Sequence, residues 1–274
     1  MDITLRRDGA VPFFACDDPA WRGAAHGFST RLGGVSPAPW DSLNLGPSRG
    51  DDPENVRENY RRFCAVLGTA PEQAVLSQQT HTTNLRRVTA EDAGKGLIRP
   101  RDYRDVDALM TDVPGLALTV FSADCGVILL HDPVHAAIAA IHAGWRGCAG
   151  GILAKTVRAM TENCGTDPAD LLAAIGPCIG PCCFETDDDV PAAMRAALGA
   201  DAEPCLRYQA PKWHVDLSGL NRQWLLRAGL LPEHIERSEL CTACRPDLFW
   251  SHRKMGERRG VQAAMIALPG REDA

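Results

Sequence analysis

The sequence lacks the features of several common functional classes. It has 274 residues, with 29 Lys and Arg against 35 Asp and Glu, so it carries no positive excess that would attract DNA, RNA or anionic membranes. No apolar run approaches the roughly 20 residues of a membrane span. The opening segment, MDITLRRDGAVPFFAC, has no apolar core of the length that a secretory signal needs. We therefore expect a cytoplasmic protein with no nucleic-acid and no membrane partner.

Two further absences concern metals and disulfides. The eight histidines include no His-x-His pair, and multicopper oxidases build their clusters from such pairs, so the residues give little support to a copper oxidase. The eleven cysteines are an odd number, which argues against a complete disulfide framework. In the cytosol thiols stay reduced, and we expect most of these cysteines to be small buried hydrophobic residues.

The chain contains no internal repeat, low-complexity tract or long linker, which predicts one domain over residues 1–274. The clearest element is a helix that begins after the cap residue Asp52, has Pro53 at its first position and ends at Gly68. Its apolar stripe consists of Val56, Tyr60, Phe63 and Leu67.

The remaining apolar segments are short and interspersed with helical ones. We predict strands at 74–76, 85–88, 116–121, 127–130, 136–141, 171–175 and 261–268, and helices at 152–163, 189–198 and 217–228. Residues 31–46 are predicted to be an ordered loop, and the tail from 249 to 260 a strand followed by a charged loop. This pattern lacks regular βαβ alternation and predicts an α+β domain with mixed sheets and helices outside them.

The stretch from Ser122 to Gly147 places reactive groups at the ends of apolar runs. Asp124 and Cys125 follow one predicted strand, and His142 follows another. Fixed backbones present reactive groups to ligands at such strand ends. Cysteine and histidine together can form either a metal site or a thiolate nucleophile, and the residues alone leave both interpretations open.

A second group of cysteines has the spacing of half a zinc site. Cys241 and Cys244 form a Cys-x-x-Cys motif, and Cys178, Cys182 and Cys183, in a turn rich in Gly and Pro, could supply the other half. No thioredoxin-like context surrounds the motif. We interpret these cysteines as packing residues.

Several motifs carry a resemblance to a known family. They are HGFSTRLGGVS (26–36), SLNLG (42–46), DDPENVRENYRR (51–62), QTH (79–81), SADC (122–125), HAGWRG (142–147), GPCIGPCCFE (176–185) and CTACRPDLFWSHR (241–253). In this order they resemble the YfiH family, also called the laccase-domain or multicopper polyphenol oxidase family, whose members are regarded as purine nucleoside phosphorylases. The resemblance implies a sandwich-like core of mixed sheets flanked by helices.

The resemblance also implies a zinc ion held by His81, Cys125 and His142, with copper as the alternative metal. Three protein ligands and an open position are typical of catalytic zinc. One departure from the family pattern concerns the pocket edge, where Gly260 is followed by Val261 instead of Arg.

The implied reactions are phosphorolysis of adenosine, inosine and methylthioadenosine, with adenosine deamination as a side activity. An open zinc position would activate water by lowering its pKa toward ~7. Cys125 and His142 are then catalytic as well as ligands, and Asp124 is the candidate for proton handling, with turn capping as its alternative role.

A bound phosphate needs an anion site. The segment GWRGCAGG opens a helix, so its backbone N–H groups favour an anion, and Arg146 adds a positive charge. Arg31, Asn44, Gln79 and Arg253 are further candidates for phosphate or substrate binding from the family-like motifs.

Three alternatives remain at this stage. In a metal-free hydrolase, which could edit cell-wall precursors, Cys125 is the nucleophile, His142 or His81 the base, and Asp124 the orienting group. The others are a copper-dependent polyphenol oxidase and a non-catalytic binding module. The expected partners are a nucleoside and phosphate, and the protein is expected to be a monomer or a homodimer.

Overall fold

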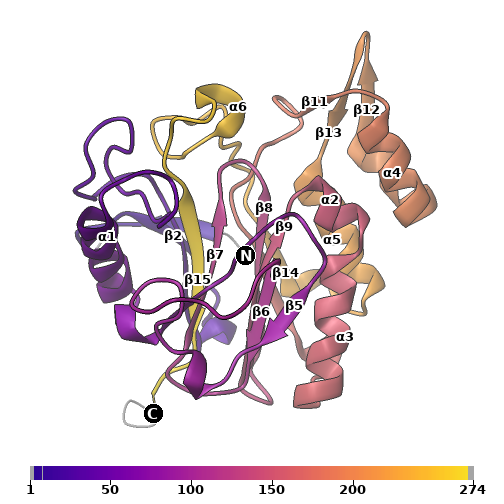
Figure 1. Ribbon diagram of the computed structural model, residues 1–274. Helices are drawn as coiled ribbons and strands as arrows, with labels where there is room; N and C mark the ends of the chain where they lie inside the picture. Colours follow the sequence, from indigo (N-terminus) through magenta and orange to yellow (C-terminus); the bar gives the residue numbers. More distant parts are fainter. Residues whose placement is uncertain (1–2, 8, 271–274) are drawn as a thin grey trace.

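A computed structural model describes residues 3–7 and 9–270, which form two large sheets and a small third one (Figure 1). The first sheet has six strands in the order β1 (Ile3–Arg6), β2 (Phe13–Cys16), β3 (Ala25–Ser29), β15 (Gln262–Ala267), β7 (Ala117–Ser122) and β4 (Ala74–Leu76). All of its pairings are antiparallel except β4 with β7. It is therefore a mixed sheet, as the sequence predicts.

The second sheet also has six strands and is also mixed. Its order is β14 (Ile235–Arg237), β10 (Leu172–Ile175), β8 (Gly126–Asp132), β9 (Ala137–Ala143), β6 (Ala108–Thr111) and β5 (Leu85–Arg87). The two edge strands pair in parallel, and the central pairs are antiparallel. The third sheet has the order β11 (Glu185–Thr186), β13 (Lys212–Val215) and β12 (Leu206–Gln209).

The two large sheets pack face to face. Alternate residues of β15, such as Ala264 and Ile266, share one buried cluster with Val127 and Leu129 of β8 in the other sheet. The residues between them in β15, such as Met265, pack instead against α1. Because both faces of these strands are buried, their sequences are continuous apolar runs. The sandwich-like core implied by the resemblance is confirmed.

Six α-helices of the described residues surround the sheets, and some of them cover the outer faces of the two large sheets (Figure 1). They are α1 (Pro53–Val66), α2 (Trp145–Ala149), α3 (Ile152–Cys164), α4 (Asp189–Leu198), α5 (Leu217–Arg227) and α6 (His252–Met255). Helix α1 packs on the first sheet, α3 and α5 pack on the second, and α2 and α4 contribute to a separate cluster with the third sheet.

Helix α1 has the caps that its sequence predicts. The Asp52 side chain accepts a hydrogen bond from the Glu54 backbone N–H at 2.9 Å, and Pro53 is the first helical residue. Val56, Tyr60 and Phe63 are buried against the sheet. Gly68, with φ of 65°, lies just beyond the end of the helix, where a left-handed conformation favours glycine.

Other predictions need correction. The tail after Phe249 contains no strand before β15: Ser251 caps the short helix α6, which replaces the predicted strand because its polar residues have no apolar face to bury in a sheet. The segment GWRGCAGG, which was expected only to lead into the helix at 152–163, itself forms the short helix α2. The sequence analysis did not identify β1 to β3, β6, β14 or the third sheet. Residues 31–46 contain neither a helix nor a strand, as predicted.

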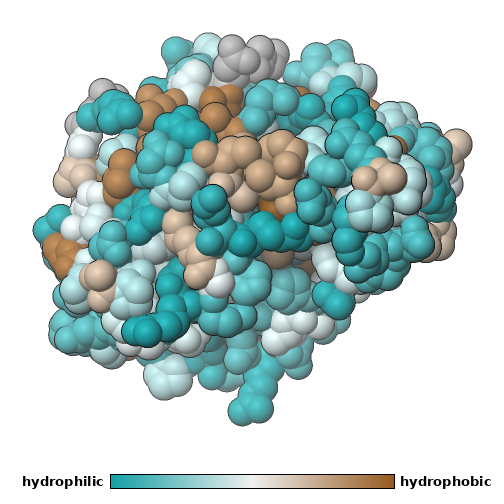
Figure 2. Space-filling model, turned by 90° about the horizontal axis from the view of Figure 1, so that it is seen from above, coloured by the Kyte–Doolittle hydropathy of each residue, from teal (hydrophilic) through white to brown (hydrophobic). Residues whose placement is uncertain are grey.

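Within the described part of the chain, no helix combines the length and apolarity needed to cross a membrane. Seen from above, the surface is mostly hydrophilic, with smaller apolar patches near its centre (Figure 2).

Candidate metal centre and pocket

Two connections between strands and one strand bring His81, Cys125 and His142 together. His81 lies in the loop between β4 and β5, and Cys125 lies in the turn Ala123–Cys125 between β7 and β8. His142 is in β9, opposite Val127 of β8 in an antiparallel register that brings the start of β8 beside the end of β9. The turn therefore delivers Cys125 next to His142, although 16 residues separate them in the sequence.

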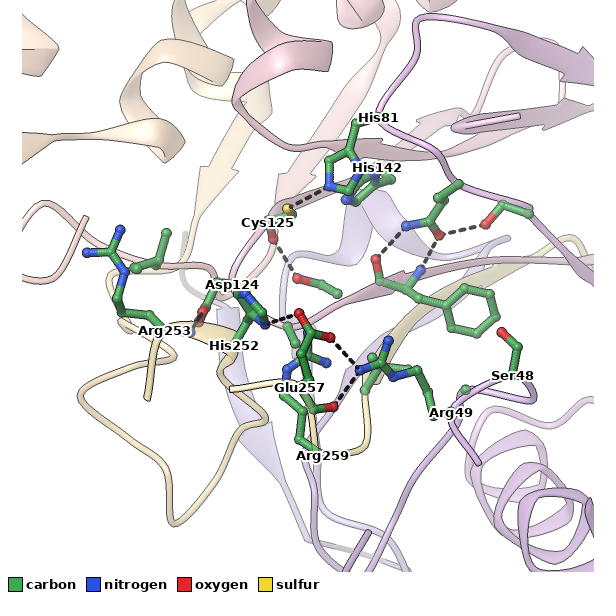
Figure 3. Close-up of a pocket in the computed structure, with 18 of the residues that line it drawn as sticks. Ser48, Arg49, His81, Asp124, Cys125, His142, His252, Arg253, Glu257 and Arg259 are labelled. Carbon is green, nitrogen blue, oxygen red and sulfur yellow. Dashed lines mark hydrogen bonds and ion pairs between the residues drawn. The ribbon is translucent and has the colours of Figure 1, made fainter. Parts of the chain in front are cut away.

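The ligand atoms of these side chains share one small space (Figure 3). They all lie within 4.8 Å of one another. The Cys125 sulfur is 3.8 Å from Nε2 of His81, and the rings of His81 and His142 meet edge to face with centroids 5.0 Å apart. Two imidazoles and one thiolate at these separations are suitable ligands for a divalent zinc ion.

Asp107, just before β6, binds His142 and the loop that carries His81, and it was not identified from the sequence. Its carboxylate lies 2.8 Å from Nδ1 of His142, which leaves Nε2 of that ring directed to the cluster. It also accepts hydrogen bonds from the backbone N–H groups of Thr80, His81 and Thr82. One buried carboxylate therefore fixes both histidines. No local motif marks this role, because it depends on the pairing of β6 with β9.

Close approach and backbone strain also mark the cluster. A Cβ atom added to Gly144 would lie 2.9 Å from the Cys125 sulfur and 3.2 Å from Cδ2 of His81, so only glycine leaves room there. His81 and Asp124 have φ angles of 64° and 96°, which non-glycine residues seldom adopt. Such conformations tend to concentrate at functional sites.

Electrostatic coupling favours a thiolate beside an imidazolium. Burial raises the pKa of Cys125, but His142 and His81 outweigh burial and lower it to about 6. Burial lowers the pKa of His142, but the Cys125 thiolate and Asp107 outweigh burial and raise it to about 9. For Asp107, burial raises the pKa, while His142 and the backbone N–H groups of Thr82 and Thr80 lower it to about 2. The anionic sulfur is the form that binds metals or acts as a nucleophile.

The cluster borders a cavity of about 600 Å³, a volume suited to a small-molecule ligand. The polar and charged residues on its wall include Arg49, Gln79, Arg101, Asp124, Arg146, His252, Arg253, Glu257 and Arg259. Apolar positions on the wall include Phe121, Ile179, Phe184 and Val261. The pocket thus combines a candidate metal site with several cationic groups.

Asp124 lies in the pocket wall, 8 % exposed, with both carboxylate oxygens engaged. Oδ1 accepts a hydrogen bond from the Thr242 hydroxyl at 2.6 Å, and Oδ2 accepts one from the Arg253 backbone N–H at 2.7 Å. Its backbone C=O accepts a further bond from Ile179. Asp124 therefore joins three segments of the wall, in addition to any role in proton transfer.

Three of the other predicted binding residues line the cavity. The guanidinium of Arg146 stacks on Trp145 and, within the described residues, forms no hydrogen bond or ion pair. Arg253 donates to the backbone carbonyls of Cys183 and Glu185. The Gln79 side chain donates a hydrogen bond to the Phe121 backbone C=O and accepts one from the Phe121 N–H.

Arg31 and Asn44 are not among the residues that line the cavity, which does not support their prediction as binding residues. Arg31 stacks on Trp250 and donates to carbonyls of Asp41 and Pro246. Asn44 is fully buried, and its Oδ1 accepts hydrogen bonds from Gly46 and Val261. Their polar groups are used to order the loops, since buried polar groups require partners.

Two arginines that the sequence analysis did not select extend into the pocket instead. Arg49 follows the SLNLG motif and pairs with Glu257, and Arg259 comes from the charged loop before β15. The Nε–H groups of both are buried and have no partner among the described residues. Arg259 is 8 % exposed, and burial, followed by the charge of Arg49, lowers its pKa. Arg259 is buried and Arg49 is half-buried beside it, and two adjacent cations favour an anionic ligand.

Comparisons with known proteins agree with this architecture. The model of a family described as multi-copper polyphenol oxidoreductase laccase matches residues 25–269. The purine nucleoside phosphorylase YlmD of Geobacillus stearothermophilus is 38% identical over 263 residues, which is 94% of each chain. The purine nucleoside phosphorylase YfiH of Escherichia coli K12 is 36% identical over 91% of this chain and 97% of that one.

Solved structures give the same result. The crystal structure of the Bacillus licheniformis hypothetical protein YfiH superposes with a TM-score of 0.91 at 33% sequence identity, covering 96% of this chain and 98% of that one. The match in sequence spans nearly the whole sandwich, including all three residues of the His–Cys–His cluster. The chain therefore belongs to the laccase-domain purine nucleoside phosphorylase family that includes YfiH and YlmD.

Proposed function

We propose that this chain is a zinc-dependent purine nucleoside phosphorylase that acts on adenosine, inosine and methylthioadenosine and also deaminates adenosine. The names of its relatives support the reaction class. The observation that carries the proposal is the position of His81, Cys125 and His142 at the edge of a cavity that is also lined by arginines, of which Arg259 is buried.

The residues present fit a zinc ion. The donor set is two imidazole nitrogens and one thiolate, and Asp107 orients the His142 ring in the way that carboxylates support zinc-bound histidines elsewhere. When bound, zinc supplies a Lewis acid that can polarise an oxygen or lower the pKa of water. The chain's own residues supply binding, orientation and proton transfer.

Phosphorolysis requires a phosphate held against C1′ of the ribose. A phosphate oxygen forms a bond to C1′ while the bond from C1′ to the base breaks, and the base leaves with the bonding electrons and takes up a proton. We assign the phosphate to Arg49 and Arg259, whose unpaired Nε–H groups it would satisfy, with Arg146 as a third cation at the pocket wall.

Asp124 is the proposed proton-handling group. Each carboxylate oxygen accepts one hydrogen bond from the protein and retains a further lone pair for a proton that moves to or from the purine. Its fixed orientation, held by Thr242 and Arg253, suits a group that must keep its geometry during turnover.

The proposal is tested by incubating the purified protein with adenosine in the presence and absence of inorganic phosphate. We expect ribose 1-phosphate and adenine only when phosphate is present, and inosine as the product of deamination in either case. Cys125→Ala protein is the matched control for contaminating enzymes. Release of free ribose without phosphate, or no product at all, contradicts the phosphorylase assignment.

The phosphate assignment has its own test. Arg259→Gln removes a buried cation, and we expect the KM for phosphate to rise roughly tenfold, equivalent to about 1.4 kcal/mol, with a smaller change in the KM for adenosine. Arg258→Gln, at the neighbouring exposed position, is the control. Equal effects of the two substitutions on the phosphate KM would show that Arg259 does not bind the phosphate.

A metal-free thiolate hydrolase is the second candidate, and one observation favours it. The pair of Cys125, with its pKa of about 6, and His142, with its pKa of about 9, has the charge state of an activated nucleophile. Elemental analysis separates the two candidates. Stoichiometric zinc that protects Cys125 from alkylation supports the phosphorylase, whereas active, metal-free protein that alkylates at Cys125 supports the hydrolase.

A further inference from the structure

A second cluster of metal-binding side chains lies outside the ligands described above. Cys182 and Cys183 come from the loop before β11, and Cys241 and Cys244 come from the loop after β14. All four sulfur atoms lie within 4.8 Å of one another. The Cys244 sulfur is 3.5 Å from that of Cys182 and 3.4 Å from that of Cys183, residues 62 and 61 positions away.

The separations fit a tetrahedral metal site. Zinc–sulfur bonds of about 2.3 Å place the sulfurs of a tetrahedral Cys₄ site about 3.8 Å apart. The shortest sulfur separations here fall slightly below that value, and none exceeds 4.8 Å. Because Cys244 contacts two cysteines at nearly equal distance, the sulfurs surround a common centre instead of forming one isolated pair.

The surrounding backbone is arranged around the sulfurs. The Gly180 N–H donates a hydrogen bond to the Cys241 sulfur at 3.2 Å, an interaction that stabilises a thiolate. A Cβ added to Gly180 would lie 3.3 Å from Cβ of Cys241 and 3.4 Å from the Cys182 sulfur. The backbones of the two loops also pair through an isolated β-bridge between Cys178 and Cys241, whose thiols are free. Close packing of two loops on a group of thiols is typical of structural zinc sites.

The burial of these residues argues against packing as their role. Cys178 is buried, in agreement with the packing interpretation, but Cys182 and Cys244 are exposed, so for these two that interpretation is wrong. Exposed cysteines contribute little to a hydrophobic core. Four thiolates this close repel one another, and a bound cation removes that repulsion.

We propose that Cys182, Cys183, Cys241 and Cys244 bind one zinc ion in a closed structural site. Soft thiolate donors select zinc over harder divalent cations, and four of them complete a tetrahedron and leave no position for a substrate. The site is separate from the His–Cys–His cluster in every ligand, and it does not depend on the function proposed for that cluster.

The four-cysteine site would stabilise one wall of the pocket. Thr242, between two of the cysteines, donates its hydroxyl hydrogen to Asp124 at 2.6 Å. Arg253, whose backbone N–H also binds Asp124, donates a side-chain hydrogen bond to the carbonyl of Cys183 at 2.9 Å. A zinc ion that joins the two loops would therefore hold both hydrogen-bond donors of Asp124 in place.

The test counts zinc in full-length protein that is purified with reductant and then dialysed. We expect two zinc ions per chain in the unmodified protein, one for each cluster, as measured by plasma mass spectrometry. The double variant Cys182→Ser/Cys244→Ser should retain one zinc ion, and so should Cys125→Ala. Cys164→Ser, in a half-buried cysteine outside both clusters, should retain two.

X-ray absorption at the zinc edge of the Cys125→Ala protein gives a second measurement. This variant leaves the two loops that carry the four cysteines unchanged. We expect only sulfur scatterers at about 2.3 Å. The inference is overturned if this protein holds no zinc, if its zinc has nitrogen or oxygen ligands, or if intact protein contains a disulfide among the four cysteines. One sulfur-bound zinc in both the unmodified and Cys125→Ala proteins supports this site and contradicts the His–Cys–His proposal.

Discussion

The two cysteine-containing clusters of this chain differ in donor set and surroundings. His81, Cys125 and His142 combine two nitrogens with one sulfur beside a cavity of about 600 Å³. The other cluster consists of four sulfurs from two loops. Three ligands beside a cavity leave a coordination position for substrate or water, whereas four sulfurs fill the tetrahedron. The donor sets are therefore the basis for proposing a reactive role for the first cluster and a structural role for the second.

The support of each cluster differs as well. In the first cluster, the Asp107 carboxylate orients His142 and binds the backbone of the His81 loop. In the second cluster, a backbone N–H from Gly180 supports a sulfur. An ionised carboxylate raises the basicity of a histidine ligand and fixes its tautomer, which matters for reactivity. A backbone N–H only stabilises charge and position, which is sufficient for a structural site.

The largest expected effect is the loss of nucleoside turnover when a ligand of the first cluster is removed. Cys125→Ala should lower nucleoside turnover on the order of 10³-fold or more, because the removed sulfur acts as a unit with the two histidines. The folded state should persist in circular dichroism, since Cys125 lies at the edge of a cavity and outside the sandwich core. Full activity in a metal-free Cys125→Ala protein would rule out the zinc mechanism.

Asp124→Asn should lower turnover by about 10²-fold without loss of metal. The amide cannot exchange protons as the carboxylate does, while both clusters keep all their proposed zinc ligands. Steady-state kinetics together with zinc analysis measure the two quantities. Thr242→Val is the companion variant, because it removes one hydrogen bond to Asp124 but leaves its carboxylate. Unchanged turnover in Asp124→Asn would remove this residue from the catalytic list.

Asp107→Asn should weaken zinc binding at the first cluster alone, by about 10- to 100-fold. The amide is a poorer acceptor for the His142 Nδ1–H and carries no charge to support the ring. Competition with a chelator measures the affinity. Asp105→Asn is the control, since that carboxylate bonds to the Thr80 hydroxyl and does not contact the ring. Equal zinc loss from both clusters would contradict the prediction.

The smallest effect concerns pH. In metal-free protein the Cys125 thiolate is present above its pKa of about 6 and is lost as the pH falls through that value. Alkylation by iodoacetamide, followed by peptide mass spectrometry, should therefore reach half its maximal rate near pH 6 at Cys125. Burial raises the pKa of Cys164, so this control should react only at alkaline pH. An alkaline midpoint at Cys125 would contradict the ion pair.

The sequence analysis predicts best where local rules determine the structure. The cap and stripe of α1 lie within 17 residues, and the buried strands β7, β8 and β9 appear as apolar runs. The hairpin of β12 and β13 was not predicted, although LRYQ and KWHV both alternate apolar and polar residues, because each strand is only four residues long. Strands β1 to β3 are short, and β2 and β3, with the sequences FFAC and AHGFS, do not alternate clearly.

Long-range contacts explain the missing parts of the site. The resemblance supplied His81, Cys125 and His142, but Asp107 becomes part of the cluster only through strand pairing. Arg259 was assigned to a charged loop, and its burial beside Arg49 depends on how that loop folds back over the pocket. Cys182 and Cys244 were assigned to packing because spacing alone does not show that two distant loops meet.

The turn from Ala123 to Cys125 carries the chain from one large sheet to the other and serves both clusters at once. Cys125 belongs to the first cluster. Asp124 accepts a hydrogen bond from Thr242, which lies between Cys241 and Cys244 of the second cluster. Such a short crossover has no spare length, so inserting a single residue would misalign both ends together. By contrast, the exposed tip at residues 209–211 of the β12–β13 hairpin has room for grafted peptides or tags. Anyone engineering this scaffold should extend the hairpin and leave the crossover at its present length.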